Sequence, residues 1–467
     1  MINRIKKIEP KKIVIAFLVI YFTLFSLTVS LKHLSMQTAL FDFSLEAQVI
    51  RKTAEGNLFA SGVEVPNYLG DHFSPLPVVL SAVVYKVIPS DFTILLLQPL
   101  LVVIGLWYFY KLCIYYKLKP HIAILFTVLM GFVPGIQCAV IFDYHPIMYA
   151  FPILLAAIYY DKKGKLLLSL GLFFLACLVK EDVGLFVAGY GILQILEKRK
   201  IGILLTILGI GIAYASMFYI IPGIRGEESD SLMRYSQFGT NGVEIVKNIV
   251  LKPLDTISYL LTLRNLGYLL ILFTPFLFIP LIKYKEFIFL FLPSYAVNIF
   301  SSFQNQTDGK HYYDILITIA LGYMLILGWK KLENSIKLKD KFKTIAKLSI
   351  ILLIVILPFW KLYPDMNRIL GNNFSEYFEI GRIIDRNFRK SDIIGVSNYA
   401  GAHLSKFDNV YIVYPDWTPN IKVTYDYILL YKPEIPGNFL EDNALKFQEY
   451  NIAYNSDKFI LLRKVGY

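Results

Sequence analysis

The stretch IVIAFLVIYFTLFSLTVSL, residues 13–31, contains nineteen residues without a charge and directly follows Lys11 and Lys12. A signal peptide would have a shorter apolar region and a small-residue cleavage site. A helix of this length instead crosses the hydrocarbon core of a bilayer, which is about 30 Å thick. The stretch therefore predicts a retained transmembrane helix, and the basic residues before it place the N-terminus on the cytoplasmic side.

The composition of the whole chain agrees with this reading. Of 467 residues, 56% are hydrophobic and 18% are charged, against about 25% charged in an ordinary soluble domain. One soluble core could not bury that much apolar surface. The net charge of +12 could suggest nucleic acid, but most basic residues lie in short clusters between apolar runs. Cys113, Cys138 and Cys177 all fall inside apolar runs and have neither metal-site nor disulfide spacing.

Ten further apolar runs predict membrane spans. They cover 92–110, 121–140, 146–160, 166–179, 183–196, 201–221, 266–282, 286–303, 312–329 and 345–360. The segment 75–89 is different, because it is short, begins with Pro75 and Pro77, and contains Lys86. We predict that it is a re-entrant or interfacial segment.

The distribution of Lys and Arg supports this topology. The segments expected inside are 2–12, 111–120, 161–165, 197–200, 283–286 and 330–347, and they contain 23 Lys and Arg in 52 residues. The segments expected outside before the tail contain 10 in 103 residues. The density therefore differs by about fivefold in the direction of the positive-inside rule. Treating 75–89 as a crossing would reverse most of that bias, so we expect about eleven transmembrane helices and an outer C-terminus.

The chain divides into two predicted domains. Residues 1–360 form an all-α polytopic transmembrane domain with an outer loop, 32–74, that contains an amphipathic helix from Ser44 to Leu58. Residues 361–467 form a small extracytoplasmic α/β domain. Its expected helices are 375–388 and 444–450, and its expected strands are 393–396, 410–413, 427–431 and 458–463. The tail has no glycine-rich phosphate loop, so no nucleotide is assigned to it.

Five polar groups lie at the ends of apolar runs, all on the expected outer side. They are Asp42, then Asp71 with His72, then Asp143 with His145, then Lys180 with Glu181 and Asp182, and finally His311 with Asp314. Ionisable residues near membrane depth are costly and indicate function by default. Structural alternatives remain open. Asp42 could cap a helix, Lys180 could pair internally with Glu181 or Asp182, and the other residues could be ordinary loop or capping residues.

These residue types suit three kinds of chemistry. Lysine can bind a phosphate as a point charge. A carboxylate such as Asp42 can accept a proton from an attacking hydroxyl. Asp42, Asp71 and His145 together could hold a Mg²⁺- or Mn²⁺-like ion through mixed oxygen and nitrogen ligands. The spacing matches no zinc motif, no Walker loop and no nucleophile elbow.

The motifs around these residues are familiar. Phe41-Asp42, Gly70-Asp71-His72-Phe73-Ser74-Pro75, Asp143-Tyr144-His145-Pro146 and Val179-Lys180-Glu181-Asp182 resemble uncharacterised prokaryotic membrane proteins catalogued as domain of unknown function 2079. The resemblance covers residues 40–200 well and 222–310 vaguely. In the tail, Val396-Ser397-Asn398 and Tyr414-Pro415-Asp416 look like the C-terminal part of that family.

That family in turn resembles membrane glycosyltransferases of the GT-C type, which use polyprenyl-phosphate sugar donors on the outer face of the membrane. Asp42 occupies the place of their acidic residue in the first outer loop. Their first loop often ends in a basic residue before Pro-Pro-Leu. Here Phe73-Ser74-Pro75-Leu76-Pro77 stands at that point, with Asp71 and His72 in place of the basic residue. Lys180-Glu181 replaces the Lys-Gly of a later hairpin.

The resemblance implies inverting transfer of a sugar from a polyprenyl-phosphate donor, in a multi-pass protein of the cell membrane with no nucleic-acid partner. Asp42 would be the general base. The substrate-binding residues would be Asp71, His72, Asp143, His145, Lys180, Glu181, Asp182 and His311, of which Lys180 and His145 would neutralise the departing lipid phosphate. A divalent cation remains an open expectation. Two other classes also remain: a transporter or flippase with a polar outer cavity, and a non-catalytic assembly or sensing protein that displays the tail.

Overall fold

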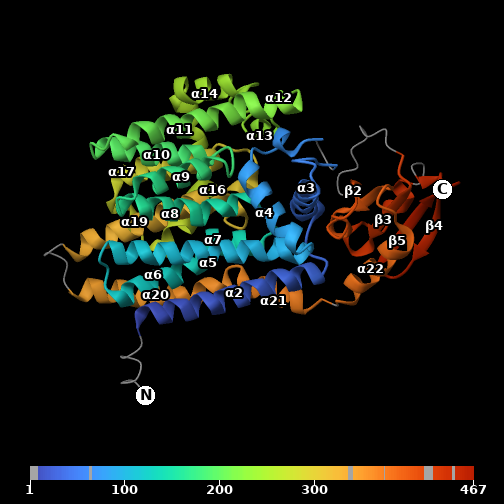
Figure 1. The fold of residues 1–467 in the computed structure, drawn as a ribbon, viewed down its shortest axis with the longest axis horizontal. Helices are drawn as coiled ribbons and strands as arrows, with labels where there is room; N and C mark the ends of the chain where they lie inside the picture. Colours follow the sequence, from blue (N-terminus) through green and yellow to red (C-terminus); the bar gives the residue numbers. More distant parts are fainter. Residues whose placement is uncertain (1–8, 63–65, 335–339, 373, 415–423, 444–446) are drawn as a thin grey trace, which may run out of the picture.

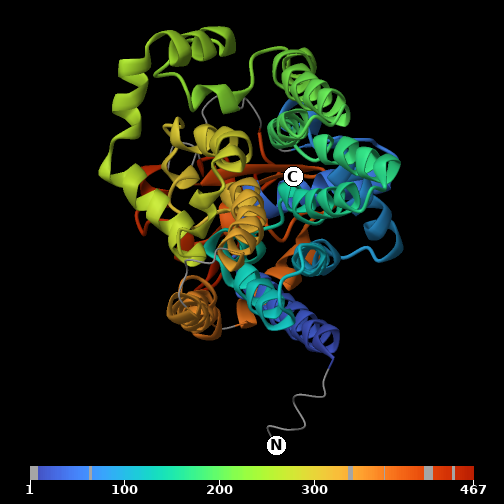
Figure 2. The same cartoon turned by 90° about the vertical axis from the view of Figure 1, so that its left-hand side faces the viewer.

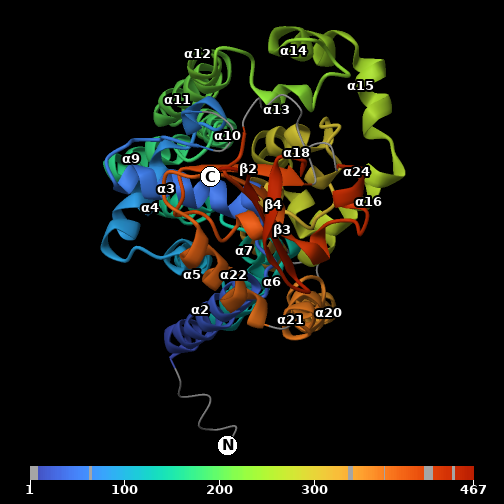
Figure 3. The same ribbon diagram turned by 90° about the vertical axis from the view of Figure 1, so that its right-hand side faces the viewer.

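The protein is an elongated helical body with a small sheet domain at one end (Figure 1). This architecture was obtained as a computed structural model, which describes residues 9–62, 66–334, 340–372, 374–414, 424–443 and 447–467. Figure 2 views the body from the end opposite the sheet, where many helices are seen nearly end-on. Figure 3 views the opposite end, with the sheet in front of the helices.

The N-terminal half supplies most of the long helices. They are α2 (Pro10–Leu34), α3 (Leu45–Ala54), α4 (Pro75–Val87), α5 (Asp91–Tyr115), α6 (Pro120–Phe132), α7 (Pro134–Ile141), α8 (Ala150–Lys162), α9 (Leu166–Cys177), α10 (Val183–Leu196) and α11 (Ile201–Ala215). Proline opens α2, α4, α6 and α7, where its missing N–H costs no helix hydrogen bond. Most of the apolar runs predicted from the sequence correspond to these helices.

The second half is more broken. It contains α12 (Ile221–Arg225), α13 (Asp230–Met233), α14 (Gly242–Leu251), α15 (Pro253–Leu260), α16 (Leu263–Phe273), α17 (Tyr284–Glu286), α18 (Leu292–Ile299), α19 (Ile315–Glu333), α20 (Asp340–Ile356) and α21 (Leu362–Leu370). Helices α14 and α15 arch away from the body (Figures 2 and 3). Val243, Leu251 and Leu254 on this arch are exposed and do not line a cavity described below, which suits a face turned to lipid.

Several helices are long and apolar enough to cross a membrane. Among the described residues there are five such helices, or up to seven if each of two bent helix pairs forms one span. Helices α4, α9 and α10 are apolar but shorter. The predicted number of eleven crossings therefore stays a prediction. Helix α4 has 13 residues and so a length of about 20 Å, but α8 with 13 residues and α9 with 12 are as short, so the predicted non-crossing path of 75–89 stays a prediction.

Glycine allows α10 and α11 to pack closely. A Cβ added at Gly184 would lie 2.5 Å from the carbonyl oxygen of Gly209, and one added at Gly202 would lie 2.5 Å from the carbonyl oxygen of Gly191. Small residues at such contacts let membrane helices approach backbone to backbone. This tight pair fixes the start of α10, where the polar residues 180–182 lie.

The sheet domain has the strand order β2-β1-β3-β5-β4. Its strands are β1 (Ile393–Ser397), β2 (Asn409–Tyr414), β3 (Tyr427–Tyr431), β4 (Tyr450–Asn455) and β5 (Phe459–Lys464), and its helices are α22 (Ser375–Asn387), α23 (Asn398–Gly401) and α24 (Phe439–Asp442). Strands β2, β1 and β3 are parallel, whereas β5 and β4 add antiparallel pairs.

The predicted α/β tail is largely confirmed, with one error. The helix predicted over 444–450 is wrong at its end, because Tyr450 begins strand β4, and residues 444–446 lie outside the described part of the chain. Strand β4 was missed because most of its side chains are exposed, so burial imposes no apolar alternation on them. Pro415 and Asp416 of the family-like motif also lie outside the described residues.

The tail domain docks directly on helix α3. Arg51 donates from Nε to the Ser405 carbonyl oxygen at 3.1 Å, and its Nη2 pairs with Asp408 Oδ1 at 2.6 Å. Gln48 donates to the Phe407 carbonyl oxygen at 2.8 Å. Met36 and Leu40 contribute to the apolar core of the sheet domain. The tail is therefore anchored on the segment 32–74 that carries Asp42.

Candidate functional site

Asp42 lies in a short π-helix, η1 (Leu40–Ser44), that runs directly into α3. The residue before η1 is Ala39, and Ser44 precedes α3, so Asp42 is not at a helix-capping position and that structural alternative is wrong. Asn398 of the tail accepts a 2.9 Å hydrogen bond from the Leu40 N–H. A π-helix of this kind is rare and often occurs at functional sites. The outer loop and the tail domain together thus set the position of the Asp42 carboxylate.

His145 is the nearest ionisable partner of Asp42. Its Nε2 lies 3.5 Å from Asp42 Oδ1. Its Nδ1 donates to the backbone carbonyl oxygen of Asp143 at 2.9 Å. This arrangement leaves Nε2 as the free nitrogen of a neutral ring, facing the Asp42 carboxyl group. The two residues, 103 positions apart, form a carboxylate–histidine pair.

Burial controls the protonation of this pair. Desolvation raises the pKa of Asp42 to about 7, with a further contribution from the neighbouring Asp143 carboxylate, although 34% of the side chain remains exposed. Desolvation also lowers the pKa of His145 well below its ordinary value. His145 is therefore neutral at neutral pH and orients Asp42. The predicted role of His145 as a cation facing a phosphate does not fit this geometry.

Asp143 is already fully engaged by the protein. Its Oδ1 pairs with Lys32 Nζ at 2.7 Å, and its Oδ2 accepts from the Ala39 N–H at 2.7 Å. The residue is 2% exposed. Asp143 thus ties the end of α2 to the start of η1 and is a positioning residue for Asp42 rather than a ligand-binding one. The break of 49° between α6 and α7 brings the segment of Asp143 and His145 to this position.

His72 and Glu181 form a second carboxylate–histidine pair. His72 Nδ1 lies 3.4 Å from Glu181 Oε1, and Asp71 Oδ2 lies 4.0 Å from His72 Nε2. Burial by itself would lower the pKa of His72, but the carboxylates of Asp71 and Glu181 outweigh it and raise that pKa. Against the effect of its own burial, Lys180 and His72 lower the pKa of Glu181 to about 2. Glu181 is therefore ionised at neutral pH, whereas Asp42 titrates near neutral pH.

Lys180 connects the two pairs. Its Nζ lies 5.6 Å from the centre of the Tyr312 ring. The same ring stacks on His145, with centroids 3.6 Å apart, so Tyr312 links Lys180 to the Asp42–His145 pair. Burial opposes the charge on Lys180, but Glu181 and Asp182 more than compensate and leave its pKa above the ordinary value. Lys180 is therefore a buried, persistent cation beside the Asp42–His145 pair.

A cavity of about 660 Å³ opens beside this cluster. Its polar end contains His72, Lys180, Glu181 and Asp182, and also Arg234, which sequence reasoning missed. The remaining walls are mainly apolar and come from several helices, with Leu185, Ile210, Met217, Phe218, Ile245, Val246, Ile249 and Val250 among their residues. Asp42 and His145 do not line the cavity directly and lie behind Tyr312, which does.

Arg234 is a cation at the polar end of the cavity. It lies over the ring of Phe303, with its guanidinium carbon 5.0 Å from the ring centre, and 6.0 Å from that of Tyr313. The described residues include no carboxylate within ion-pair distance of it. In the sequence, Arg234 is one of several charged residues in the region 222–310, where the family resemblance is weak, so no motif indicated it.

His311 belongs to a neighbouring cluster. Its Nδ1 pairs with Asp308 at 3.0 Å, and its ring contacts Phe142 with centroids 5.2 Å apart. It does not line the cavity. His311 therefore lies near the site, with its imidazole already held by a carboxylate.

Glu46 is a buried acid that sequence reasoning also missed. It follows Asp42 by four residues on the same continuous helix and accepts a hydrogen bond from the Tyr68 hydroxyl. Desolvation raises its pKa to about 8, so Glu46 is largely protonated at neutral pH. The spacing of four residues along a helix could have indicated it, because such residues share a face.

The residues proposed for a metal are only partly together. Asp42 and His145 are 3.5 Å apart, whereas Asp71 faces His72. Within the described parts of the chain, no three His, Cys, Asp or Glu side chains are grouped to hold a metal ion. The Nδ1 bond of His145 to a carbonyl is the usual support of a metal-ligating imidazole. A Mg²⁺ or Mn²⁺ ion on Asp42 and His145 would need substrate or water oxygens as its other ligands, and it stays a prediction.

Comparisons with known proteins give a family and a fold. The family model described as "Predicted membrane protein (DUF2079)" matches residues 32–458. No curated protein matches the sequence. The crystal structure of ArnT from Cupriavidus metallidurans bound to undecaprenyl phosphate is similar with a TM-score of 0.52 and 12% identity, over 96% of this chain and 98% of that chain. The apo ArnT structure gives a TM-score of 0.45 and 12% identity, over 95% and 97%.

Proposed function

This chain belongs to the DUF2079 family of predicted membrane proteins, and on that premise we propose that it is a membrane glycosyltransferase that uses a polyprenyl-phosphate sugar donor. The observation that carries the proposal is the 660 Å³ cavity with a cationic end and apolar walls. A lipid phosphate has the same division, with an anionic head and an apolar chain. ArnT, whose fold is similar, was crystallised with undecaprenyl phosphate.

The cations of the cavity suit a phosphate. Lys180 and Arg234 can each neutralise part of the charge that develops on a departing lipid phosphate, and fixed charges in a site of low dielectric stabilise such a transition state strongly. The carboxylates of Asp71 and Glu181 raise the pKa of His72, which favours a third positive group here. The apolar residues of α11 and α14 then lie where the first isoprene units would pack.

The proposed reaction uses the Asp42–His145 pair as the base. Asp42, oriented by neutral His145, removes the proton from an acceptor hydroxyl. The acceptor oxygen forms a bond to the anomeric carbon, the bond from that carbon to the phosphate oxygen breaks, and the electron pair leaves with the lipid phosphate. The proton remains on Asp42, and the configuration of the sugar inverts. Tyr312 lies between the base and Lys180 and so separates the acceptor side from the donor side.

Binding of undecaprenyl phosphate to the purified protein tests the donor site. Native mass spectrometry should find that Lys180→Met and Arg234→Met each weaken binding by about tenfold or more, because a hydrogen bond to a charged group contributes about 1.5–3 kcal/mol. Lys310→Met is the matched control, since Lys310 is exposed on the same face and does not line the cavity. Equal binding of undecaprenyl phosphate and uncharged undecaprenol would contradict the proposal.

A lipid transporter or flippase is a second candidate, favoured by one observation. Two helix pairs that could span the membrane are bent, by 49° at α6–α7 and by 65° between α15 and the helix that follows it, and broken helices are common at transporter substrate sites. Proteoliposomes that move fluorescent lipid phosphate across the bilayer, unaffected by Asp42→Asn, would favour this candidate over the enzyme.

A further inference from the structure

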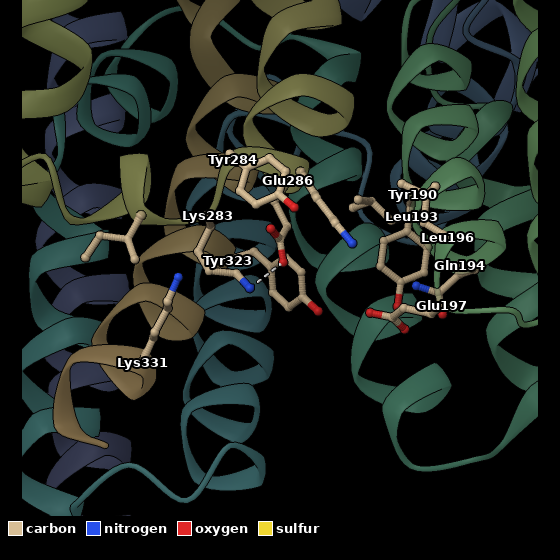
Figure 4. Close-up of a pocket in the computed structure, with 12 residues that line it drawn as sticks. Tyr190, Leu193, Gln194, Leu196, Glu197, Lys283, Tyr284, Glu286, Tyr323 and Lys331 are labelled. Carbon is tan, nitrogen blue, oxygen red and sulfur yellow. Dashed lines mark ion pairs between the residues drawn. The ribbon is translucent and has the colours of Figure 1, made fainter. Parts of the chain in front are cut away.

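A second pocket lies at the opposite end of the helical body from Asp42. It has a volume of about 250 Å³ and lies between the C-terminal end of α10, the segment 282–286 and α19 (Figure 4). Helix α19 begins beside the outer cluster at residues 312–314 and has 19 residues, so its far end is about 28 Å away along its axis. This pocket is therefore separate from the proposed donor cavity.

The pocket is lined by three lysines. Lys283 directly precedes the short helix α17, Lys285 lies within it, and Lys331 comes from the last turn of α19. In Figure 4, Lys331 and Glu197 lie on opposite sides of the pocket, with Tyr323 between them. The segments 197–200, 283–286 and 330–347 are those that the charge distribution places on the cytoplasmic side. The pocket thus lies where a membrane protein meets the anionic inner surface of the bilayer.

The pairing of charges leaves a positive excess in this pocket. Glu286 pairs with Lys283 at 3.0 Å, and Glu197 pairs with Lys162, outside the pocket, at 3.5 Å. The two carboxylates of the pocket are thereby compensated. Within the described residues, neither Lys285 nor Lys331 has a carboxylate partner at ion-pair distance. The ammonium groups of Lys285 and Lys331, both exposed at the edge of the pocket, are therefore available to bind an anion.

The inner wall of the pocket contains tyrosine hydroxyls that are already hydrogen-bonded. The Tyr190 hydroxyl donates to Asp161 Oδ2 at 2.6 Å, and the Tyr323 hydroxyl is bonded to that of Tyr116 at 2.8 Å. These tyrosines are buried and give the pocket a rigid base. A phosphate at the rim would meet Lys285 and Lys331 as point charges, with the aromatic floor behind it.

We propose that this inner pocket binds a phosphate group through Lys285 and Lys331. The phosphate can belong to the headgroup of an anionic phospholipid or be free in the cytoplasm, and basic pockets between membrane helices on this side are suited to the former. The site does not depend on the proposed transferase activity.

Native mass spectrometry of the full-length protein tests the site. Wild type should retain phosphatidylglycerol in preference to phosphatidylcholine. The double variant Lys285→Ala/Lys331→Ala should bind phosphatidylglycerol about tenfold or more weakly, because each lysine near an anionic surface contributes about 1 kcal/mol. The matched control, Lys119→Ala/Lys200→Ala, removes two exposed lysines of the same face that do not line the pocket. The outer variant Lys180→Met should leave phosphatidylglycerol binding unchanged.

Inorganic phosphate distinguishes the two sources. If millimolar phosphate displaces phosphatidylglycerol from wild type, the site accepts free phosphate. If it does not, the headgroup is the ligand. Both results support a phosphate site. Equal retention of the two lipids by wild type, or equal loss in the test and control double variants, would overturn it. Lys331→Gln alone, which keeps a polar side chain, gives the same comparison if the double variant does not fold.

Discussion

At the scale of single residues, the central feature is that two similar pairs of side chains have different charge states. His145 and His72 each face a carboxylate at about the same distance, 3.5 and 3.4 Å. Desolvation dominates at the first pair, so Asp42 is poised near neutral pH. Nearby charges dominate at the second, so Glu181 stays ionised. Environments that separate the pKa values of like groups are the usual way to assign acid and base roles.

Replacing Asp42 by asparagine tests its role as the base. Asp42→Asn should lower sugar transfer about a hundredfold or more, the scale of general acid–base catalysis, while binding of undecaprenyl phosphate stays close to normal. Transfer would be followed with radiolabelled undecaprenyl-phosphate sugars prepared from bacterial membranes. Asp308→Asn is a suitable control, since Asp308 pairs with His311 at the neighbouring cluster. A normal rate of transfer by Asp42→Asn would show that Asp42 is not the base.

The pH dependence of transfer follows from the same carboxyl group. Because the pKa of Asp42 is about 7 and only the ionised form accepts a proton, the rate should rise as pH increases through about 7. His145 stays neutral over this range, since burial lowers its pKa, and Lys180 stays charged, since its pKa is raised above the ordinary value. The measured profile of kcat/KM should have one acid limb near neutrality. A rate that falls as pH rises from 6 to 8 would be incompatible with Asp42 as the base.

At the scale of elements, helix α3 couples the tail to the site. Arg51 is buried and bonded to the Ser405 carbonyl oxygen and to Asp408, and η1, which carries Asp42, is continuous with the same helix. A shift of the tail therefore moves the helix that holds the base. This coupling gives the tail domain a positioning role that its sequence alone did not suggest.

Arg51→Met should loosen this contact, because it leaves the Ser405 carbonyl oxygen without its donor and removes the closest cation from Asp408, at about 1–3 kcal/mol for such a loss. Hydrogen exchange should increase at α3 and at residues 403–409. Lys406→Met is the control, because Lys406 pairs with Asp385 where both side chains are exposed, and such surface pairs contribute about 0–1 kcal/mol. Similar exchange in the two variants would argue against the coupling.

At the scale of the whole molecule, the two ends of the helical body differ in charge and in chemistry. One end bears the Asp42 cluster and the tail domain, and the other bears basic loops and the lysine pocket (Figures 1 and 4). The positive-inside rule assigns the second end to the cytoplasm. If that orientation holds, the cavity beside Lys180 lies on the outer side, where the proposed reaction would occur.

Single cysteines test this orientation. An impermeant thiol reagent should label Asn451→Cys, on exposed strand β4, in intact cells, whereas Lys163→Cys should react only after the membrane is broken. Cys113, Cys138 and Cys177 are buried and should contribute little background. The opposite pattern of labelling would invert the topology, and both proposed sites would change sides with it.

The sequence by itself determined the class of the protein and most of its helices, because apolar runs and loop charges act locally and over short distances. It also indicated Asp42, His145 and Lys180, since ionisable groups beside apolar runs are conspicuous. Only the tertiary structure decided that Asp143 pairs with Lys32 and that His145 lies beside Asp42. It also decided that Arg234 lines the cavity. These pairings join residues more than 50 positions apart, and desolvation, which fixes their charge, depends on what the folded chain packs around them.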